Sequence, residues 1–445
     1  MVDLKTFYNI LFILAFVLAS PYYFVRMRRR GNWKPGFGQR FGKYDSDIRQ
    51  AITNRHVIWF HAVSVGEVNV CTHLIRSIEP RLPNAKIVVS TTTTTGMAEL
   101  RSKLPTHITK IYYPIDRRRY VSRALASLHP EAIILVEAEI WPNFIWRAQV
   151  LDIPLFLVNA RLSDKSYRGY KRWGFLFRRL FSAFDGVGVQ NEADAARLRE
   201  LGCRPEAVRV VGSLKFDAAR LNERRRLDAR GMLRQVGVTP ETKVLVCGST
   251  HAGEEALLAD IYLRLKKKHP GLFLVMVPRH FERGRDVGRD LQSRGLKFLF
   301  RSEIRAQTHN PPGAIDCLIV NSTGELRYFY EEATLIFVGK SLKAEGGQNP
   351  IEPGALGKPV LFGPNMQNFA EIAKNFVSRG GAVQVSDASE LESALDELLS
   401  DESRRAEVGR RALEVVKENM GAIEHTVDMI LKGIQEKQFY VAPRK

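Results

Sequence analysis

Two glutamates that follow apolar runs are the first candidate functional residues of this chain. Glu67 comes after the turn Ser64-Val65-Gly66, and Glu137 ends the strongly apolar run that starts at Ile133. An unpaired carboxylate next to such a run is costly to bury, so we expect Glu137 to be functional or ion-paired. For Glu67 a second interpretation stays open, because an acidic residue in the first turn of a helix interacts favourably with the helix dipole.

Further polar clusters in the second half of the chain also lie at the ends of predicted strands. They are Pro278-Arg279-His280, Ser322-Thr323-Gly324-Glu325 and the turn Gly248-Ser249-Thr250-His251. In open α/β sheets the carboxyl ends of parallel strands are the usual place for a ligand. Arg279 taken alone could equally be a surface charge.

The stretch 345–364 (EGGQNPIEPGALGKPVLFGP) connects two predicted strands. Gly346 and Gly347 allow a tight turn and a close backbone approach to a ligand. Glu352 follows Pro350, a position that suits the first turn of a short helix. Such a loop is a usual nucleotide site, although an ordinary strand–loop–helix connection would have the same pattern.

Apolar runs alternating with helical stretches are the elements that would position these residues. This spacing predicts a doubly wound parallel sheet in each half, and therefore an α/β protein with two Rossmann-like domains facing a cleft. We place the N-terminal domain at 31–220 and the C-terminal domain at 221–445, joined by the basic stretch 214–233. The runs that support this prediction are 56–61, 86–92, 133–137, 155–159, 187–190, 243–247, 272–277, 335–338 and 359–362.

The N-terminal segment 1–30 is predicted to be a membrane anchor. Residues 7–25 are apolar, and Arg26, Arg28, Arg29 and Arg30 follow at once. About twenty helical residues cross a hydrocarbon core of ~30 Å, and the basic flank places the rest of the chain in the cytoplasm. A cleaved signal peptide and a shallower interfacial helix are the alternatives.

Charge and cysteine content narrow the class of partner. The formal net charge is +19 and the sequence pI is about 9.8, which indicates an acidic partner. Nucleic acid is the weakest candidate, since no nucleic-acid-binding signature is found. The four cysteines are far apart and are expected to be reduced core residues, and no metal-ligand spacing occurs. Residues 165–181 mix aromatic and basic side chains, which suits either a membrane contact or a helix with its aromatic face in the core.

Taken together, these motifs resemble the Kdo transferases of lipopolysaccharide synthesis, which move 3-deoxy-D-manno-oct-2-ulosonic acid (Kdo). The resemblance spans nearly the whole chain and implies a two-domain, inverting glycosyltransferase of the B type without a cofactor or metal. Its motifs, in order, are RFGKY, HAVSVGEV, EAEIWPN, NARLSDKS, QNEADAARL, GSLKFD, STHAGEE, VPRH, TGEL and GGQNPIEP.

The resemblance also implies roles for particular residues. Glu67 matches the general base, and Glu137 and Lys215 match groups that stabilise the transition state. CMP is expected at three segments: Pro278 with Arg279; Thr323, Gly324 and Glu325; and Asn349, Pro350, Ile351 and Glu352. Pro353-Gly354 departs from the commoner pattern after Glu352.

The implied partners are CMP-Kdo, the lipid A precursor (lipid IVA) and the anionic surface of the cell inner membrane, on its cytoplasmic face. Both substrates are acidic, which agrees with the basic charge of the chain. Two alternatives remain: a UDP-sugar transferase acting on a lipid-linked acceptor, and a non-catalytic membrane-bound nucleotide sensor.

Overall fold

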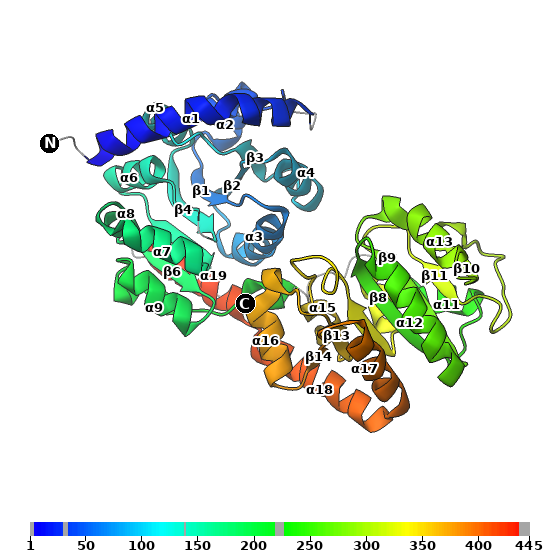
Figure 1. Cartoon of the computed structure of the whole chain (residues 1–445). Helices are drawn as coiled ribbons and strands as arrows, with labels where there is room; N and C mark the ends of the chain where they lie inside the picture. The colour runs from blue at the N-terminus through cyan, green and yellow to red at the C-terminus, as the bar shows by residue number, and fades with distance from the viewer. Residues whose placement is uncertain (1–3, 30–33, 138, 219–226, 436–445) are drawn as a thin grey trace. The chain divides into compact units, whose positions relative to one another are not determined.

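The computed structural model describes residues 4–29, 34–137, 139–218 and 227–435. The chain forms two compact units: unit 1 is Met1–Ala218 with Met420–Lys445, and unit 2 is Ala219–Asn419. Each unit is built on a 7-stranded sheet, and all the strand pairs are parallel. The predicted fold class, two Rossmann-like α/β units, is therefore confirmed (Figure 1).

The sheet of unit 1 has the order β3-β2-β1-β4-β5-β6-β7, with helices on both faces. Its strands are β1 (His56–His61), β2 (Ala85–Thr91), β3 (Thr109–Tyr112), β4 (Pro130–Val136), β5 (Leu155–Ala160), β6 (Gly186–Val189) and β7 (Val208–Val210). Its helices are α1 (Leu4–Arg29), α2 (Ser46–Ile52), α3 (Val65–Ile78), α4 (Thr94–Lys103), α5 (Arg118–Leu128), α6 (Pro142–Val150), α7 (Asp164–Arg172), α8 (Gly174–Phe181), α9 (Glu192–Glu200), α10 (Leu214–Ala218) and α19 (Ala422–Gln435).

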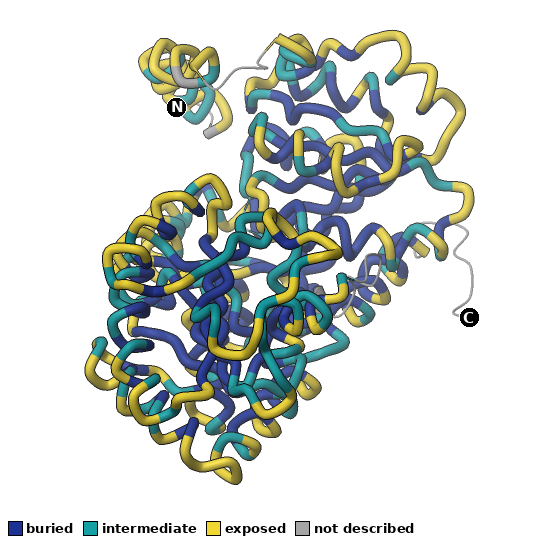
Figure 2. Tube along the Cα trace, turned by 90° about the vertical axis from the view of Figure 1, so that its right-hand side faces the viewer, coloured by how far each residue is buried: buried dark blue, intermediate teal, exposed yellow. Residues whose placement is uncertain are grey.

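Strand β1 shows why a continuous apolar run becomes a central strand. Val57 and Trp59 belong to the core on one face of the sheet, while Ile58 and Phe60 belong to the core on the other face. Successive side chains of a strand point to opposite faces, so a strand covered on both sides needs an apolar residue at every position. Figure 2 shows the resulting buried interior of the sheets.

The sheet of unit 2 has the order β10-β11-β9-β8-β12-β13-β14. Its strands are β8 (Lys243–Thr250), β9 (Leu272–Pro278), β10 (Phe298–Phe300), β11 (Cys317–Ile319), β12 (Leu335–Val338), β13 (Val360–Phe362) and β14 (Ala382–Gln384). Its helices are α11 (Ala229–Gln235), α12 (Glu254–Lys268), α13 (Gly284–Gln292), α14 (Leu326–Glu331), α15 (Ile351–Ala355), α16 (Ala370–Ser378), α17 (Ala388–Ser400) and α18 (Glu402–Glu418).

The last helix, α19, belongs to unit 1 although it follows unit 2 in the chain. Ile423, Val427 and Ile430 are buried in the same core cluster as Val68 and Leu74 of α3. Asp217 of α10 accepts hydrogen bonds of 2.8 Å from the backbone N–H groups of Gly421 and Ile423 at the start of α19. The predicted C-terminal domain, 221–445, therefore extends too far. The second unit ends at Asn419, and residues from Met420 onward belong to the first unit. Part of the basic linker, residues 219–226, lies outside the described residues.

By its length and composition, helix α1 is long and apolar enough to cross a membrane. It is mostly exposed (Figure 2) and runs along one side of unit 1 (Figure 1). Residues 1–3 and 30 of the predicted anchor lie outside the described residues.

Candidate active site

The two predicted glutamates flank the point where the strand order of unit 1 reverses. From β1 the sheet continues on one side to β2 and on the other side to β4. Glu67 lies in the first turn of α3, which follows β1, and Glu137 directly follows β4. Ligands of open α/β sheets bind at this crevice, outside the carboxyl ends of the strands.

Glu67 is held in place by a capping box at the start of α3. Its backbone N–H donates to Ser64 Oγ (3.2 Å), and its carboxylate accepts from the backbone N–H groups of Val63 (2.8 Å) and Ser64 (3.3 Å). The side chain is 8 % exposed. Glu67 therefore does lie in the first turn of a helix, as one of the two interpretations of the sequence expects. The capping contacts also fix the direction of its carboxylate.

Glu137 has a strained backbone and a perturbed carboxyl group. Its φ of 62° lies in the left-handed region that non-glycine residues rarely adopt. Burial raises the pKa of Glu137, and the nearby Glu67 carboxylate raises it further, while Lys215 and Arg161 oppose the shift. The sheet positions this residue firmly, since its backbone N–H donates to Val158 O (2.9 Å) on β5.

Asn159, at the end of β5, connects the parts of the cluster. It is fully buried and also has a positive φ, of 54°. Its Nδ2 donates to Glu137 Oε1 (3.4 Å), while its Oδ1 accepts from Gln190 Nε2 (3.1 Å) and from the backbone N–H of Leu214 (3.4 Å). The last contact ties α10, which carries Lys215, to the strand beside Glu137.

Lys215 completes a cluster of two carboxylates and two cations. Burial lowers the pKa of Lys215, and the Glu137 carboxylate opposes this shift more strongly than Glu67 does. The structure thus brings together Glu67, Glu137 and Lys215, the three residues for which a catalytic role was expected. Arg161 and Asn159 were not singled out from the sequence, although both come at or just after the end of β5, the strand beside β4. In such a cluster a carboxylate can accept a proton, and the two cations can stabilise negative charge that develops on a substrate.

His61, at the end of β1, is fully buried. Its Nδ1 lies 2.9 Å from Ser90 Oγ, and its ring stacks on Tyr113 with the centroids 3.8 Å apart. Burial lowers the pKa of His61 to about 3, so the ring is neutral at pH 7.

The motif that contains Glu137 continues into α6, whose start is capped by a buried aspartate. Asp116 accepts the backbone N–H groups of Asn143 (3.0 Å) and Phe144 (2.9 Å). Burial raises the pKa of Asp116 to about 6, against the effect of these hydrogen bonds. Glu139 accepts from Trp141 Nε1 (2.8 Å), and residue 138 lies outside the described residues.

In unit 2 the expected nucleotide-binding segments follow neighbouring strands. Pro278 ends β9 and Arg279 follows it, residues 323–325 follow β11, and residues 349–352 come after β12. In the sheet β11 lies beside β9, β9 beside β8, and β8 beside β12. All three segments therefore lie at the carboxyl edge of one sheet.

The side chains of these segments differ in how far they are already engaged. Arg279 is exposed, and its backbone N–H donates to Thr250 O (3.0 Å). Glu325 accepts from Ser322 Oγ (2.6 Å) and is paired with Arg301 Nε (3.1 Å). Within the expected donor segments, Arg279 is therefore the cation that a phosphate group could contact. Glu325 instead stabilises its own loop through Ser322 and Arg301.

The Gly-rich loop after β12 has the geometry that its sequence predicts. Gly346 and Gly347 have φ values of 120° and 68°, and Ile351–Ala355 forms a short helix with Pro350 at its N-cap. Asn349 Oδ1 accepts the N–H of Ile351 (3.0 Å), and its Nδ2 donates to Glu352 Oε1 (3.2 Å).

The fully buried Glu254 anchors the beginning of this loop. Its carboxylate accepts the backbone N–H groups of Lys340 (2.7 Å), Ser341 (2.9 Å) and Leu342 (3.0 Å). The N–H of His251 (3.0 Å) bonds to the same carboxylate. Glu254 thereby holds together the turns after β8 and β12.

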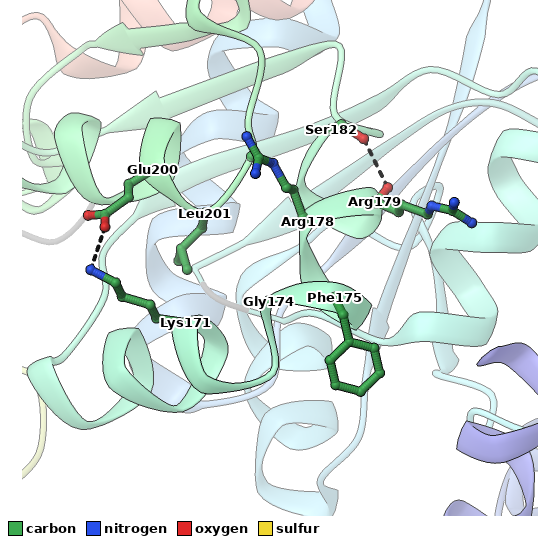
Figure 3. Close-up of a pocket in the computed structure, with 9 residues that line it drawn as sticks. Lys171, Gly174, Phe175, Arg178, Arg179, Ser182, Glu200 and Leu201 are labelled. Atoms are coloured by element: carbon green, nitrogen blue, oxygen red, sulfur yellow. Dashed lines mark hydrogen bonds and ion pairs between the residues drawn. The ribbon is translucent and has the colours of Figure 1, made fainter.

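The aromatic and basic stretch 165–181 forms α7 and α8. Its predicted packing against the core is confirmed in part, whereas a contact with a membrane stays a prediction. Tyr167, Tyr170 and Phe177 pack against the core, whereas Trp173 and Phe175 are exposed. A surface pocket beside α8 is lined by Arg178, Arg179 and other residues (Figure 3).

The remaining expectations concern cysteines and metals. All four cysteines are free and buried, as expected for core residues. Among the described residues, no group of three or more His, Cys, Asp or Glu side chains is placed to hold a metal ion.

Comparisons with known proteins extend over both units. Residues 35–218 match the family described as 3-deoxy-D-manno-octulosonic-acid transferase (kdotransferase), and residues 257–415 match glycosyl transferases group 1. The 3-deoxy-D-manno-octulosonic acid transferase of Haemophilus influenzae is 31 % identical, with 84 % of this chain and 86 % of that protein covered. The transferase of the same name from Bordetella pertussis is also 31 % identical, over 91 % of this chain and 93 % of that protein.

A solved structure shows the same fold at low identity. The UDP-GlcNAc 2-epimerase from Neisseria meningitidis aligns with a TM-score of 0.57 and 15 % identity, covering 84 % of this chain and 100 % of that chain. This likeness concerns the architecture of the two units and not the chemistry.

Proposed function

The chain belongs to the 3-deoxy-D-manno-octulosonic acid transferase family and is a glycosyltransferase that transfers Kdo in lipopolysaccharide synthesis, and we propose that its donor is CMP-Kdo and its acceptor lipid IVA. Unit 1 is proposed to bind the acceptor and unit 2 the donor. The observation that carries this proposal is the cluster of Glu67, Glu137, Lys215 and Arg161 at the strand reversal of unit 1.

Glu67 is the proposed general base. In an inverting displacement a bond forms between the acceptor oxygen and the anomeric carbon of Kdo, while the bond from that carbon to the CMP phosphate breaks. The proton of the acceptor hydroxyl passes to the Glu67 carboxylate, which two backbone N–H groups hold in a fixed direction.

Glu137, Lys215 and Arg161 are proposed to stabilise the transition state. The lowered pKa of Lys215 shows that its surroundings disfavour the isolated cation, so it gains from a nearby anion such as Glu137 or a substrate phosphate. The raised pKa of Glu137 makes it the second candidate for the base.

The donor phosphate is proposed to bind at Arg279, with Thr323, Gly324 and the segment 349–352 beside it. Charge on the departing CMP is then neutralised by protein cations and backbone N–H groups. We therefore expect turnover to continue when divalent metal ions are removed with EDTA.

Attachment to the cytoplasmic face of the inner membrane, through α1, is part of the same proposal. Helix α1 and the basic flank Arg28 and Arg29 suit an anionic lipid surface.

One experiment tests the whole assignment. Purified full-length protein in detergent is incubated with CMP-Kdo and the tetraacyl disaccharide bisphosphate, and the products are weighed by mass spectrometry. A mass gain of one or more Kdo residues, competed by CMP and not by UDP, is the expected result. Competition by UDP alone would favour a UDP-sugar transferase, and nucleotide binding without turnover would favour a sensor.

A further inference from the structure

The first turns of α1 are fastened to unit 1 by polar contacts. Tyr8 Oη donates to Asp116 Oδ2 (2.8 Å), and the side chains of Asn9 and Asn143 exchange hydrogen bonds of 3.1 and 3.0 Å. We call these four residues the latch. Its contacts are specific, because each joins a polar group of the helix to a polar group of the body.

The body side of the latch is rigid and prepared for these contacts. Asp116 and Asn143 are 2 % and 5 % exposed, and Asn143 Nδ2 also donates to the Asp116 backbone oxygen (2.6 Å). Next to the latch, Tyr8 packs edge-on against Trp146 with ring centroids 5.7 Å apart, and Lys5 Nζ lies 5.7 Å from the same ring.

Beyond the latch, α1 presents a long apolar surface to its surroundings. Leu18 is 81 % exposed, and the other large apolar side chains exposed on α1 are Phe7, Ile10, Leu11, Ile13, Leu14, Phe16, Val17, Tyr22, Tyr23, Phe24 and Val25. A continuous apolar surface of this length on one helix requires an apolar partner. The basic residues Arg28 and Arg29 at its end are complementary to anionic headgroups, so the partner that fits is a lipid bilayer.

The latch and a membrane-spanning helix exclude each other. The body of the protein follows the C-terminal end of α1, and so lies on the membrane side where Arg28 and Arg29 lie. Tyr8 is twenty residues before Arg28, which is ~30 Å along a helix axis and about the full thickness of the hydrocarbon core. In a spanning helix Tyr8 and Asn9 would lie at the far surface, where Asp116 and Asn143 cannot contact them.

We propose that α1 does not cross the bilayer but lies in the plane of the membrane, held to unit 1 by the latch. Tyr8 and Asn9 face the body, and the exposed apolar side chains around the rest of α1, among them Ile10, Leu14 and Leu18, enter the acyl chains. This inference rests on the membrane attachment proposed above and replaces the single-pass anchor that the sequence predicts.

The latch also connects the membrane to the candidate active site. Asp116 and Asn143 form the capped start of α6, a few residues after Glu137. A lipid acceptor drawn from the bilayer would therefore be presented next to the loop that positions the catalytic cluster.

A topology experiment decides between the two arrangements. The four native cysteines are buried, so a single Lys5→Cys substitution in the full-length chain gives a reporter near the N-terminus with low background. Ser102→Cys, at an exposed position on α4, reports the side on which the body lies. Both are treated with a membrane-impermeant maleimide in right-side-out and inside-out membrane vesicles.

An in-plane helix leaves both cysteines on one side, so both label in inside-out vesicles and neither in right-side-out vesicles. Labelling of Lys5→Cys from the opposite side to Ser102→Cys would overturn the inference. If both label only in right-side-out vesicles, the cytoplasmic location is wrong while the in-plane helix stands.

Depth measurements test the latch itself. Ile10, Leu14 and Leu18 are four residues apart on one face, so nitroxide labels at these positions should lie at one depth, within about one helical turn of ~5 Å. A spanning helix would separate the first and last by ~12 Å.

The double variant Tyr8→Phe, Asn9→Ala should release α1 and spread the three depths, while Thr6→Ala, at an exposed position, should leave them equal. Equal depths in the double variant would overturn the role of the latch.

Discussion

Replacing Glu67 by glutamine tests the proposed base most directly, provided that its structural role is measured at the same time. The Glu67 carboxylate accepts N–H groups of Val63 and Ser64. Glutamine keeps one acceptor oxygen and turns an N–H donor toward the other contact, so we expect the free energy of unfolding to fall by about 1–2 kcal/mol. The sequence alone predicts less than ~1 kcal/mol, the worth of a first-turn charge.

Ser64→Ala is the matched control, because it damages the same capping box and leaves the carboxylate. It removes the acceptor of the Glu67 N–H (3.2 Å) and should cost about 1 kcal/mol of stability. Both variants are unfolded in denaturant, and their turnover is measured with saturating CMP-Kdo and acceptor.

If Glu67 is the base, Glu67→Gln loses about a hundredfold or more in turnover. Ser64→Ala should keep turnover within a few-fold. CMP affinity should be unchanged in both, because the donor is expected on unit 2. Equal losses of turnover in the two variants would refute the assignment and leave Glu67 a capping residue. Glu137→Gln would then be the next variant to measure.

Three further outcomes are expected. Arg279→Ala should weaken CMP binding by about 2 kcal/mol, measured calorimetrically, since a charge-assisted phosphate contact is lost. The control Arg285→Ala, also exposed in unit 2, should leave CMP binding unchanged, and equal CMP affinities of the two variants would place the donor site elsewhere. The pKa of Asp116 is raised to about 6, so its contribution to stability is present below pH 4 and is lost as the pH rises through 6. The stability of the native protein relative to Asp116→Asn should therefore fall by roughly 2.5 kcal/mol between pH 4 and pH 8 in denaturant titrations, and a flat difference would contradict the shift. Deleting residues 1–25 should release much of the protein from membranes yet leave some binding to anionic vesicles through α7 and α8, with Arg178 and Arg179 contributing, and loss of all binding at low salt would exclude this second contact.

Central strands could be predicted from the sequence and edge strands could not. β1, β4, β5, β8 and β9 are covered on both faces, so their residues form continuous apolar runs. β3 (Thr109–Tyr112) contains a lysine, and β7 (Val208–Val210) has the pattern buried–exposed–exposed. Such short strands beside the edge or at the edge of a sheet need fewer apolar residues, and their sequences resemble loops.

In the candidate site, features that depend on neighbouring residues in the sequence could be predicted, and features that depend on the folded sheet could not. The first-turn position of Glu67 was predicted from the sequence, and its capping box was not, although serine and glutamate three residues apart are the signature of that motif. The positive φ of Glu137 and Asn159 leaves no mark in the sequence. The proximity of Lys215 to Glu137 depends on the order of strands across the sheet, which is a property of the folded unit. For the same reason Arg161 and Asn159 could be assigned to the site only from the structure.

The return of α19 to unit 1 has a consequence for the order in which the protein is made. Most of unit 1 precedes unit 2 in the sequence, but one face of its core is completed by residues of α19 that are synthesised only after unit 2: Ile423, Val427, Met429, Ile430 and Ile434. Unit 2 is contiguous in the chain and can close its core while synthesis continues, whereas unit 1 must wait, with its apolar α3 face uncovered, for the final helix. Helix α1 is synthesised before α19, so the apolar helix proposed to bind the membrane is exposed while the unit that carries the candidate catalytic residues is still unfinished.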